Sequence, residues 1–179
     1  MTDKKESILN TAIDLFSTQG YANTSTSRIA KEAGVSEALI FKHFKNKEGL
    51  LDAIVAQGNE HMNAFITPIL GMTDPKSIIE GMFDFLLLMV REHADFWKLQ
   101  MTLKYQSPLI AAKYHAAGKF DDLRTLLEKA YKELGYQNPK AETNLILMML
   151  GSVFTYLLEA DHIEQESFIN FLKSKYNLS

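Results

Sequence analysis

The sequence predicts an all-α fold of about nine helices, with an N-terminal three-helix helix-turn-helix domain followed by a larger helical domain. Only 4 prolines and 9 glycines occur in 179 residues, and most lie between long segments whose apolar residues recur with the helical period. No strand-like alternation extends beyond a few residues. The chain has no cysteine, which excludes disulfides, thiolate catalysis and zinc fingers.

The first predicted helix runs from about Lys4 to Gln19 and ends at Gly20. Its apolar residues lie on one broad face: Ile8, Leu9, Ala12, Ile13, Leu15 and Phe16. We expect this face to support the two helices that follow.

The segment Thr24 to Leu51 has the helix start and stop signals of two short helices and the beginning of another. Ser25 or Thr26 can cap the first of them, because a side-chain oxygen accepts a free N–H of the first turn. Gly34 can end it in the left-handed conformation, and Ser36 can cap the next. Two helices joined by a tight glycine turn are typical of the helix-turn-helix, whose second helix enters the major groove of DNA.

The second helix of this pair places Ile40 and Phe44 on its inner face, four residues apart, and leaves a mixed polar face outside. Residues 22–47 contain five lysines and arginines and two glutamates, a net charge of +3, whereas the whole chain has −3. This local positive charge is expected of a protein that meets phosphates through one small surface. Asn46 caps the next predicted helix.

A series of residues closely resembles, in order and spacing, the DNA-binding domain of TetR/AcrR-family transcriptional regulators. The matching residues are Gly20-Tyr21, Thr24-Ser25, Ile29-Ala30, Ala33-Gly34-Val35-Ser36, Ile40-Phe41, His43-Phe44, Lys47 and Leu50-Leu51. The resemblance runs from about Ile8 to Leu51. It implies a DNA-binding domain over residues 1–47 and an effector-binding and dimerisation domain over residues 48–179.

The residues expected to contact DNA are Thr26, Ser27, Glu37, Ala38, Leu39, Phe41, Lys42, His43 and Lys47. Lys47 can bind a phosphate together with the N-terminal amides of its helix, and the resemblance implies the same role; it could instead be an ordinary solvated lysine. The resemblance also implies phosphate contacts for Lys42 and His43, although His43 could stack on the hydrophobic base of the motif.

Base reading is expected from three residues of the recognition helix. Glu37 can accept from a cytosine amino group, and Ala38 and Leu39 can contact a thymine methyl. Thr26 and Ser27 resemble family residues that touch phosphate or a base, or they serve only as helix caps. Phe41 stands where the family usually has tyrosine, so a phosphate hydrogen bond is missing. Because strong base readers are few, DNA shape could also contribute.

Six further helices are predicted from the remaining periodic segments and their glycine and proline boundaries. They cover about residues 47–66, 75–93, 94–105, 108–134, 139–160 and 165–176. The segment Lys140 to Ala160 is apolar nearly all round, so it is either a central core helix or a helix that also meets a second copy of the chain. The expected interface residues are Leu147, Leu150, Gly151, Phe154, Phe168, Phe171 and Leu172. Two such helices from each subunit would form a four-helix bundle, as the resemblance also implies.

Aromatic residues and methionines between Phe83 and Tyr114 could line a cavity for an apolar effector, or simply fill a core. The expected pocket residues are Phe85, Met89, His93, Trp97, Gln100, Met101 and Tyr105. The sequence therefore predicts a homodimeric, effector-released repressor of a palindromic double-stranded DNA operator. The alternatives are a small helical enzyme, for which no catalytic motif is found, and a helical protein-protein adaptor.

No metal, cofactor or membrane span is expected. The longest apolar run is shorter than the roughly 20 residues that a membrane span needs. The N-terminus does not resemble a secretory signal, which favours a cytoplasmic location.

Overall fold

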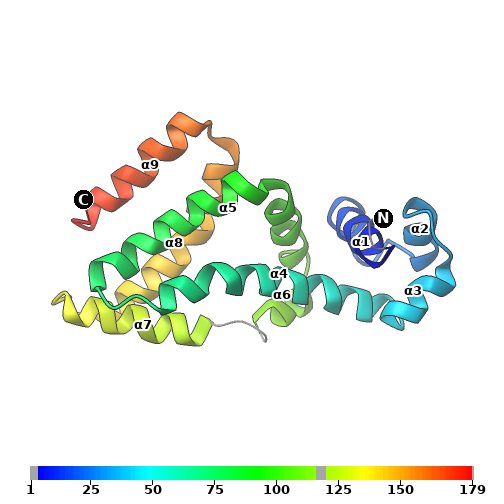
Figure 1. The fold of residues 1–179 in the computed structure, drawn as a ribbon, viewed down its shortest axis with the longest axis horizontal. Helices are drawn as coiled ribbons and strands as arrows, with labels where there is room; N and C mark the ends of the chain where they lie inside the picture. The colour runs from blue at the N-terminus through cyan, green and yellow to red at the C-terminus, as the bar shows by residue number, and fades with distance from the viewer. Residues whose placement is uncertain (1–3, 116–119, 179) are drawn as a thin grey trace. The chain divides into compact units, whose positions relative to one another are not determined.

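The computed structural model describes residues 4–115 and 120–178, which form nine helices and no strand (Figure 1). The helices are α1 (Lys4–Gln19), α2 (Thr26–Glu32), α3 (Glu37–Phe44), α4 (Lys47–Leu70), α5 (Pro75–Lys104), α6 (Pro108–His115), α7 (Phe120–Glu133), α8 (Pro139–Glu159) and α9 (His162–Lys175). The predicted all-α fold, with a helix-turn-helix at the N-terminus and a helical C-terminal part, is confirmed.

Local stop and start signals place most helix ends close to the prediction. Gly135 follows α7 with a φ of 82°, the left-handed conformation expected of a residue that ends a helix. The last helix begins three residues before the predicted Gln165, because Asp161 and Glu164 form a reciprocal capping box. α4 continues to Leu70, beyond the predicted end at Ile66, with Pro68 in its last turn.

The predicted break between two helices at residues 93 and 94 is wrong. α5 runs without interruption from Pro75 to Lys104. No glycine or proline occurs between Gly81 and Pro108, so nothing in the backbone chemistry ends the helix there. The long helix predicted for residues 108–134 is described as α6 and α7, and residues 116–119 between them lie outside the described part of the chain.

Contacts divide the chain into two compact units that alternate along the sequence. Unit 1 comprises Met1–His61 and Asp95–Gly118, and unit 2 comprises Met62–Ala94 and Lys119–Ser179. The end of α5 and all of α6 thus belong with the N-terminal helices. The boundary predicted after residue 47 follows from the expected function and stays a prediction.

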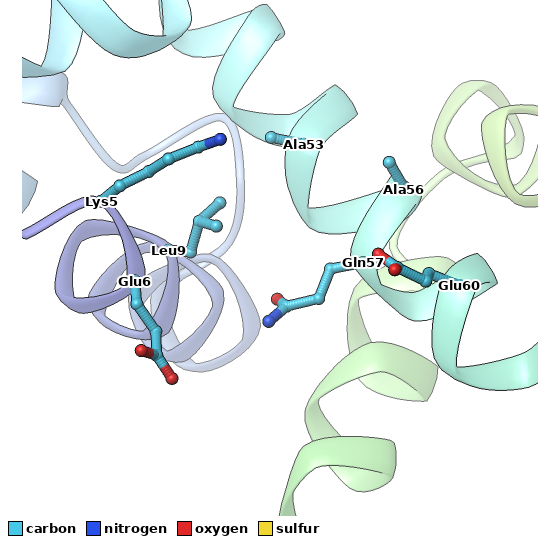
Figure 2. A pocket seen from close by; sticks show the side chains of 7 residues that line it. All are labelled: Lys5, Glu6, Leu9, Ala53, Ala56, Gln57 and Glu60. Atoms are coloured by element: carbon cyan, nitrogen blue, oxygen red, sulfur yellow. The ribbon is translucent and has the colours of Figure 1, made fainter. Parts of the chain in front are cut away.

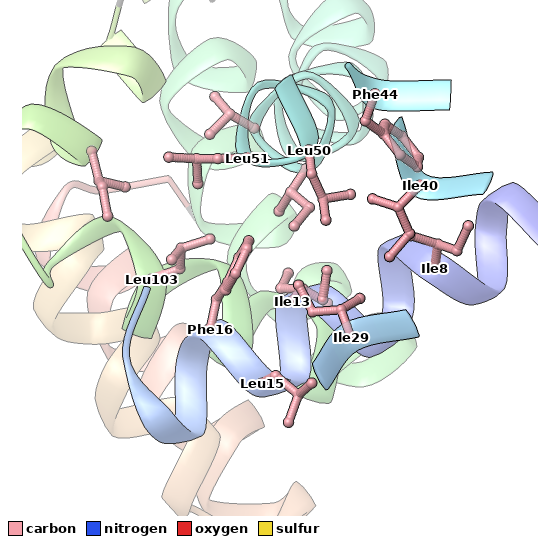
Figure 3. Close-up of a cluster of buried hydrophobic side chains, with 14 of the residues drawn as sticks. Ile8, Ile13, Leu15, Phe16, Ile29, Ile40, Phe44, Leu50, Leu51 and Leu103 are labelled. Carbon is pink, nitrogen blue, oxygen red and sulfur yellow. The ribbon is translucent and has the colours of Figure 1, made fainter. Parts of the chain in front are cut away.

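The core of unit 1 joins the N-terminal helices to the end of α5 and to α6 (Figure 3). Its fully buried side chains include Ile8, Phe16, Ile29, Ile40, Leu50 and Leu103. A buried polar group completes it: the Tyr114 hydroxyl donates to Gln100 Oε1, and Gln100 Nε2 donates to the Ile54 carbonyl oxygen at 3.3 Å. These bonds satisfy the amide that the core would otherwise bury at a cost.

Unit 2 is built on the packing of α7 against α8 and on an aromatic cluster. The rings of Phe83 and Tyr131 both lie near Tyr176, at centroid distances of 5.8 and 6.5 Å. Lys173 of α9 forms ion pairs with Glu80 at 3.0 Å and Asp84 at 2.6 Å on α5. The C-terminal helix is therefore fixed to α5 by charge as well as by apolar contacts.

Helix α8 is long and apolar enough, by length and composition alone, to cross a membrane. The core helix of a soluble protein passes the same test, and α8 buries Ile146, Val153 and Leu157 within unit 2. The predicted lack of a membrane span therefore stays a prediction.

Candidate nucleic-acid interface

Helices α2 and α3 are joined by the turn that the sequence predicts. Ser25 Oγ accepts from the Arg28 amide at 3.2 Å, and Ser36 Oγ accepts from the Leu39 amide at 3.3 Å. Gly34 has a φ of 65°; its amide donates to the Lys31 carbonyl oxygen, and the amide of the next residue donates to that of Ala30. This pair of bonds is the Schellman motif, which requires a left-handed residue at the position of Gly34. It fixes where α3 begins relative to α2.

The outer face of α3 presents mixed chemistry above a buried inner face. Ile40 and Phe44 are buried, as predicted, whereas the exposed side chains are those of Ala38, Phe41, Lys42 and His43. Leu39 is half-buried and packs against the core of unit 1, so only part of its side chain is available to a base. The His43 ring lies 6.0 Å from that of Phe44 in a tilted arrangement. The helix thus offers two cationic or polar groups and one exposed aromatic ring.

Two of the predicted DNA contacts bind each other. Thr26 Oγ1, at the start of α2, donates to Glu37 Oε1, at the start of α3, at 2.6 Å. Both side chains are half-buried, while the neighbouring Ser27 is exposed. One carboxylate oxygen of Glu37 is therefore held in place, which restricts the directions from which its other oxygen can accept a hydrogen bond.

The Lys47 ammonium is held against the turn between α1 and α2. Its Nζ lies 4.5 Å from the centroid of the Tyr21 ring and donates to the Ala22 carbonyl oxygen at 3.3 Å. Partial burial lowers the pKa of this ammonium, because the charged form loses hydration. A cation that already has an aromatic platform loses less side-chain freedom when it binds a phosphate.

Tyr21, which contacts the Lys47 ammonium, is not among the predicted site residues, because the sequence shows it only as one part of the resemblance. Its ring packs edge-to-face on that of Phe16, with centroids 5.0 Å apart. Burial raises the pKa of its hydroxyl, and the nearby Glu48 carboxylate raises it further. The signal in the sequence is an aromatic residue directly after the glycine that ends the first helix.

The connection from α3 to α4 contains a strained residue. Lys45 has a φ of 68° and a ψ of −46°, and the Asn46 amide donates to the Phe44 carbonyl oxygen at 2.8 Å. These values describe a γ-turn of the rare form with positive φ, which a side chain at the central position disfavours. Asn46 Oδ1 then accepts from the Gly49 amide at 2.7 Å, which confirms the predicted cap of α4.

Replacing Lys45 with glycine is expected to raise the free energy of unfolding by about 1 kcal/mol, because glycine adopts a left-handed φ without steric strain. Urea titration followed by circular dichroism would measure the change. Lys42→Gly is the control, since the same substitution inside α3 is expected to lower stability by about 1 kcal/mol. A Lys45→Gly protein less stable than the wild type would show that the turn stores no strain.

Comparison with known proteins identifies this N-terminal segment. The profile of a family described as bacterial regulatory proteins, tetR family, matches residues 8–54. The uncharacterized HTH-type transcriptional regulator YvkB of Bacillus subtilis (strain 168) is 39% identical over 66 residues, which are 37% of this chain and 35% of YvkB. The chain thus matches only about a third of that relative's length, whereas an HTH-type transcriptional regulator of Staphylococcus aureus (strain USA300) is 25% identical over 97% of this chain and 92% of its own.

The fold agrees with these matches. A crystal structure of AibR in complex with isovaleryl coenzyme A and operator DNA has a TM-score of 0.71 with 18% identity, and covers 97% of both chains. Residues 8–54 belong to the TetR family.

The predicted effector residues are divided between the two units. Phe85 and Met89 are buried in unit 2, whereas Trp97 and Gln100 are buried in unit 1 and Met101 is half-buried there. Tyr105 is 72% exposed, so it does not lie in the interior of unit 1. The side chain of His93 lies outside the described part of the structure. The predicted pocket stays a prediction.

Asn59 on α4 is a buried polar residue that the predicted effector set omits. Its side chain is 6% exposed, and Nδ2 has no hydrogen-bond partner among residues 4–115 and 120–178. A buried donor without a partner is uncommon. A ligand that accepts a hydrogen bond from it is expected to bind more favourably than one that does not. The sequence does not single it out, because its neighbours Gln57, Glu60 and Asn63 are polar as well.

A cleft of about 410 Å³ separates α1 from α4 within unit 1 (Figure 2). Its lining combines apolar and charged side chains: Lys5, Glu6, Leu9, Ala53, Ala56, Gln57 and Glu60. None of the predicted effector residues is among them, so this cleft is distinct from the predicted pocket.

The predicted interface residues lie mostly on the inner faces of their helices. Leu150, Phe154 and Leu172 are buried in unit 2, Leu147, Gly151 and Phe168 are half-buried, and Phe171 is 58% exposed. Other apolar side chains of α8 and α9, which the prediction omits, are also exposed: Leu145, Met148, Tyr156 and Ile163. The rings of Tyr156 and Phe168 lie 4.8 Å apart and connect the outer faces of the two helices.

Proposed function

We propose that this TetR-family chain is a homodimeric transcriptional repressor that binds a palindromic operator and is released by a small apolar effector. The observation that carries the DNA-binding part is Lys47, the first residue of α4, whose ammonium lies over the Tyr21 ring and which follows the end of α3 by three residues. A lysine at a helix N-terminus binds phosphate through both its charge and the free amides. The recognition helix then has Lys42 and His43 exposed for further phosphate contacts.

Base reading is proposed for the first turns of α3. The Glu37 carboxylate, held by Thr26, accepts from a cytosine amino group, and Ala38 and Leu39 contact thymine methyl groups. Phe41 contributes apolar contact from an exposed ring. With so few base-reading groups on each recognition helix, specificity requires two half-sites, about 34 to 36 Å apart.

A second copy of the chain is the proposed occupant of the outer faces of α8 and α9. Leu145, Met148 and Tyr156 recur along α8 at helical spacing, and Phe171 continues the apolar surface on α9. A self-complementary surface of this kind, on two helices, is suited to a two-fold symmetric four-helix bundle. Such a dimer places two recognition helices on one DNA duplex.

An effector is proposed because unit 1 buries polar groups beside large apolar ones. Asn59 Nδ2 has no hydrogen-bond partner in the part of the chain that the structure describes, and Trp97 is buried in the same unit. AibR, the structural neighbour with operator DNA, binds isovaleryl coenzyme A. Acyl-coenzyme A thioesters are therefore suitable first probes. In a regulator whose effector weakens DNA binding, the coupling free energy between the effector site and the DNA site is about 1 to 3 kcal/mol.

The test is selection of bound duplexes from a random pool, followed by anisotropy titrations at several salt concentrations. Lys47→Ala is expected to weaken all duplexes about equally and to reduce the slope of log K against log salt by about 0.9 for each phosphate that the variant no longer neutralises. Lys129→Ala is the control, because Lys129 is an exposed lysine of α7 in unit 2, so the change in net charge is the same. A wild-type protein that enriches no duplex at low salt would refute the proposal.

A further inference from the structure

Gln106 lies in the turn between α5 and α6, and its side-chain amide bonds to the main chain at the end of α1. Nε2 donates to the Phe16 carbonyl oxygen at 2.6 Å, and Oε1 accepts from the Tyr21 amide at 2.9 Å. The partners are 90 and 85 residues away in the sequence, although all lie in unit 1. One side chain thus bridges both sides of the turn that connects α1 to α2.

The two backbone groups lie at the end of a helix, where the backbone lacks hydrogen-bond partners within the helix itself. Phe16 is in the last turn of α1, where its carbonyl oxygen also accepts from the Gly20 amide, and Tyr21 follows the end of the helix. The Tyr21 amide therefore relies on a partner from outside the helix. Gln106 supplies it, and the second bond to Phe16 fixes the orientation of the amide plane.

The main chain at Tyr21 determines the position of the Lys47 ammonium. The Tyr21 ring lies beneath Nζ, and the next residue, Ala22, supplies the carbonyl oxygen to which Nζ donates. Any shift of residues 21 and 22 moves both partners of the ammonium together. Lys113 of α6 secures the same end of α4, through ion pairs with Glu48 at 3.2 Å and Asp52 at 2.6 Å.

We infer that Gln106 is a positioning residue for DNA binding, which acts through Tyr21 on the phosphate contact of Lys47. The inference rests on the proposed function, because Lys47 has this role only in a DNA-binding protein. Gln106 itself needs no contact with DNA. Its effect is to hold the platform of the ammonium, so that the lysine is already placed when a phosphate arrives.

A double-mutant cycle on the full-length protein tests this coupling. Gln106→Met keeps the length of the side chain and removes both hydrogen bonds. It is expected to weaken operator binding about three- to tenfold and to reduce the salt slope, as happens when a lysine no longer reaches its phosphate. In a Lys47→Ala background the same substitution is expected to change affinity less than twofold, because residues that act through one contact are not additive. Gln137→Met, at an exposed glutamine in the turn before α8, is the matched control.

Backbone amide NMR separates positioning from general destabilisation. Loss of the Gln106 acceptor should shift the Tyr21 amide proton upfield and speed its exchange, while amides in the core of unit 1 keep their protection. If the Met variant does not fold, Gln106→Lys, which keeps a donor for the Phe16 carbonyl oxygen but removes the acceptor of the Tyr21 amide, takes its place beside Gln137→Lys. The inference would be overturned if the Gln106 substitution left the salt slope unchanged. It would also be overturned if the substitution cost the same affinity in the wild type and in the Lys47→Ala protein. Failure of the wild type to bind any duplex would instead refute the proposed function, and the inference with it.

Discussion

Replacing Phe16 with alanine is expected to lower the free energy of unfolding by about 3 to 5 kcal/mol, the usual cost of emptying a phenylalanine site in a packed core. The Phe16 side chain is fully buried in the core of unit 1, and its ring supports that of Tyr21. The cavity would lie directly under the platform of Lys47, so operator binding should be lost together with stability. Chemical denaturation and anisotropy titration measure the two effects.

Phe41→Ala is the matched control for this prediction, because the same atoms are removed from a ring that is 45% exposed. Its free energy of unfolding should change by about 0.5 kcal/mol or less. Its affinity for DNA should still fall, since Phe41 lies on the exposed face of α3. A Phe16→Ala protein as stable as Phe41→Ala would show that Phe16 is not central to the packing of unit 1.

The features that the sequence predicted well depend on residues close together in the chain. Ser36 and Gly34 determine a cap and a turn through hydrogen bonds to neighbours within five residues. The inward positions of Ile40 and Phe44 follow from the helical period alone. The helix-turn-helix was therefore accessible from local chemistry.

Contacts between distant segments could not be predicted in this way. The bond of Gln106 to Tyr21 joins a turn after α5 to a turn after α1, and neither residue shows a pattern that selects the other. The amide of Gln100, which is also a predicted effector residue, is bonded to Tyr114 and to the main chain of Ile54, 14 and 46 residues away in the sequence. A polar residue on an apolar helix reveals that it needs a partner, but not which one.

Helix α8 shows a second limit of periodicity. Because α8 has apolar residues on nearly all of its sides, the hydrophobic pattern does not indicate which side faces the core of unit 2. The predicted interface included Leu150 and Phe154, which the structure buries, and omitted Leu145 and Met148, which it exposes. Only the positions of the neighbouring helices distinguish the two faces.

Met148→Glu is expected to convert the proposed dimer to a monomer at micromolar concentration. Met148 is 76% exposed, between Leu145 and Tyr156 on the outer face of α8, so the substitution should not disturb unit 2 itself. In a two-fold interface the carboxylate would be buried without a partner in both subunits. Each unpaired charge weakens association by about 3 to 5 kcal/mol, which raises the dissociation constant of the dimer more than about a hundredfold.

The sedimentation coefficient and the affinity for the operator should then both decrease. A monomer contacts one half-site and loses the joint binding of two recognition helices. Thr125→Glu adds the same charge to an exposed position of α7 and should leave both the mass and the affinity unchanged. If Met148→Glu still sediments as a dimer, the interface lies elsewhere than on this face of α8. If both the wild type and the variant are monomers that bind a duplex equally well, specificity comes from a single recognition helix. The sparse base-reading chemistry of α3 argues against that outcome.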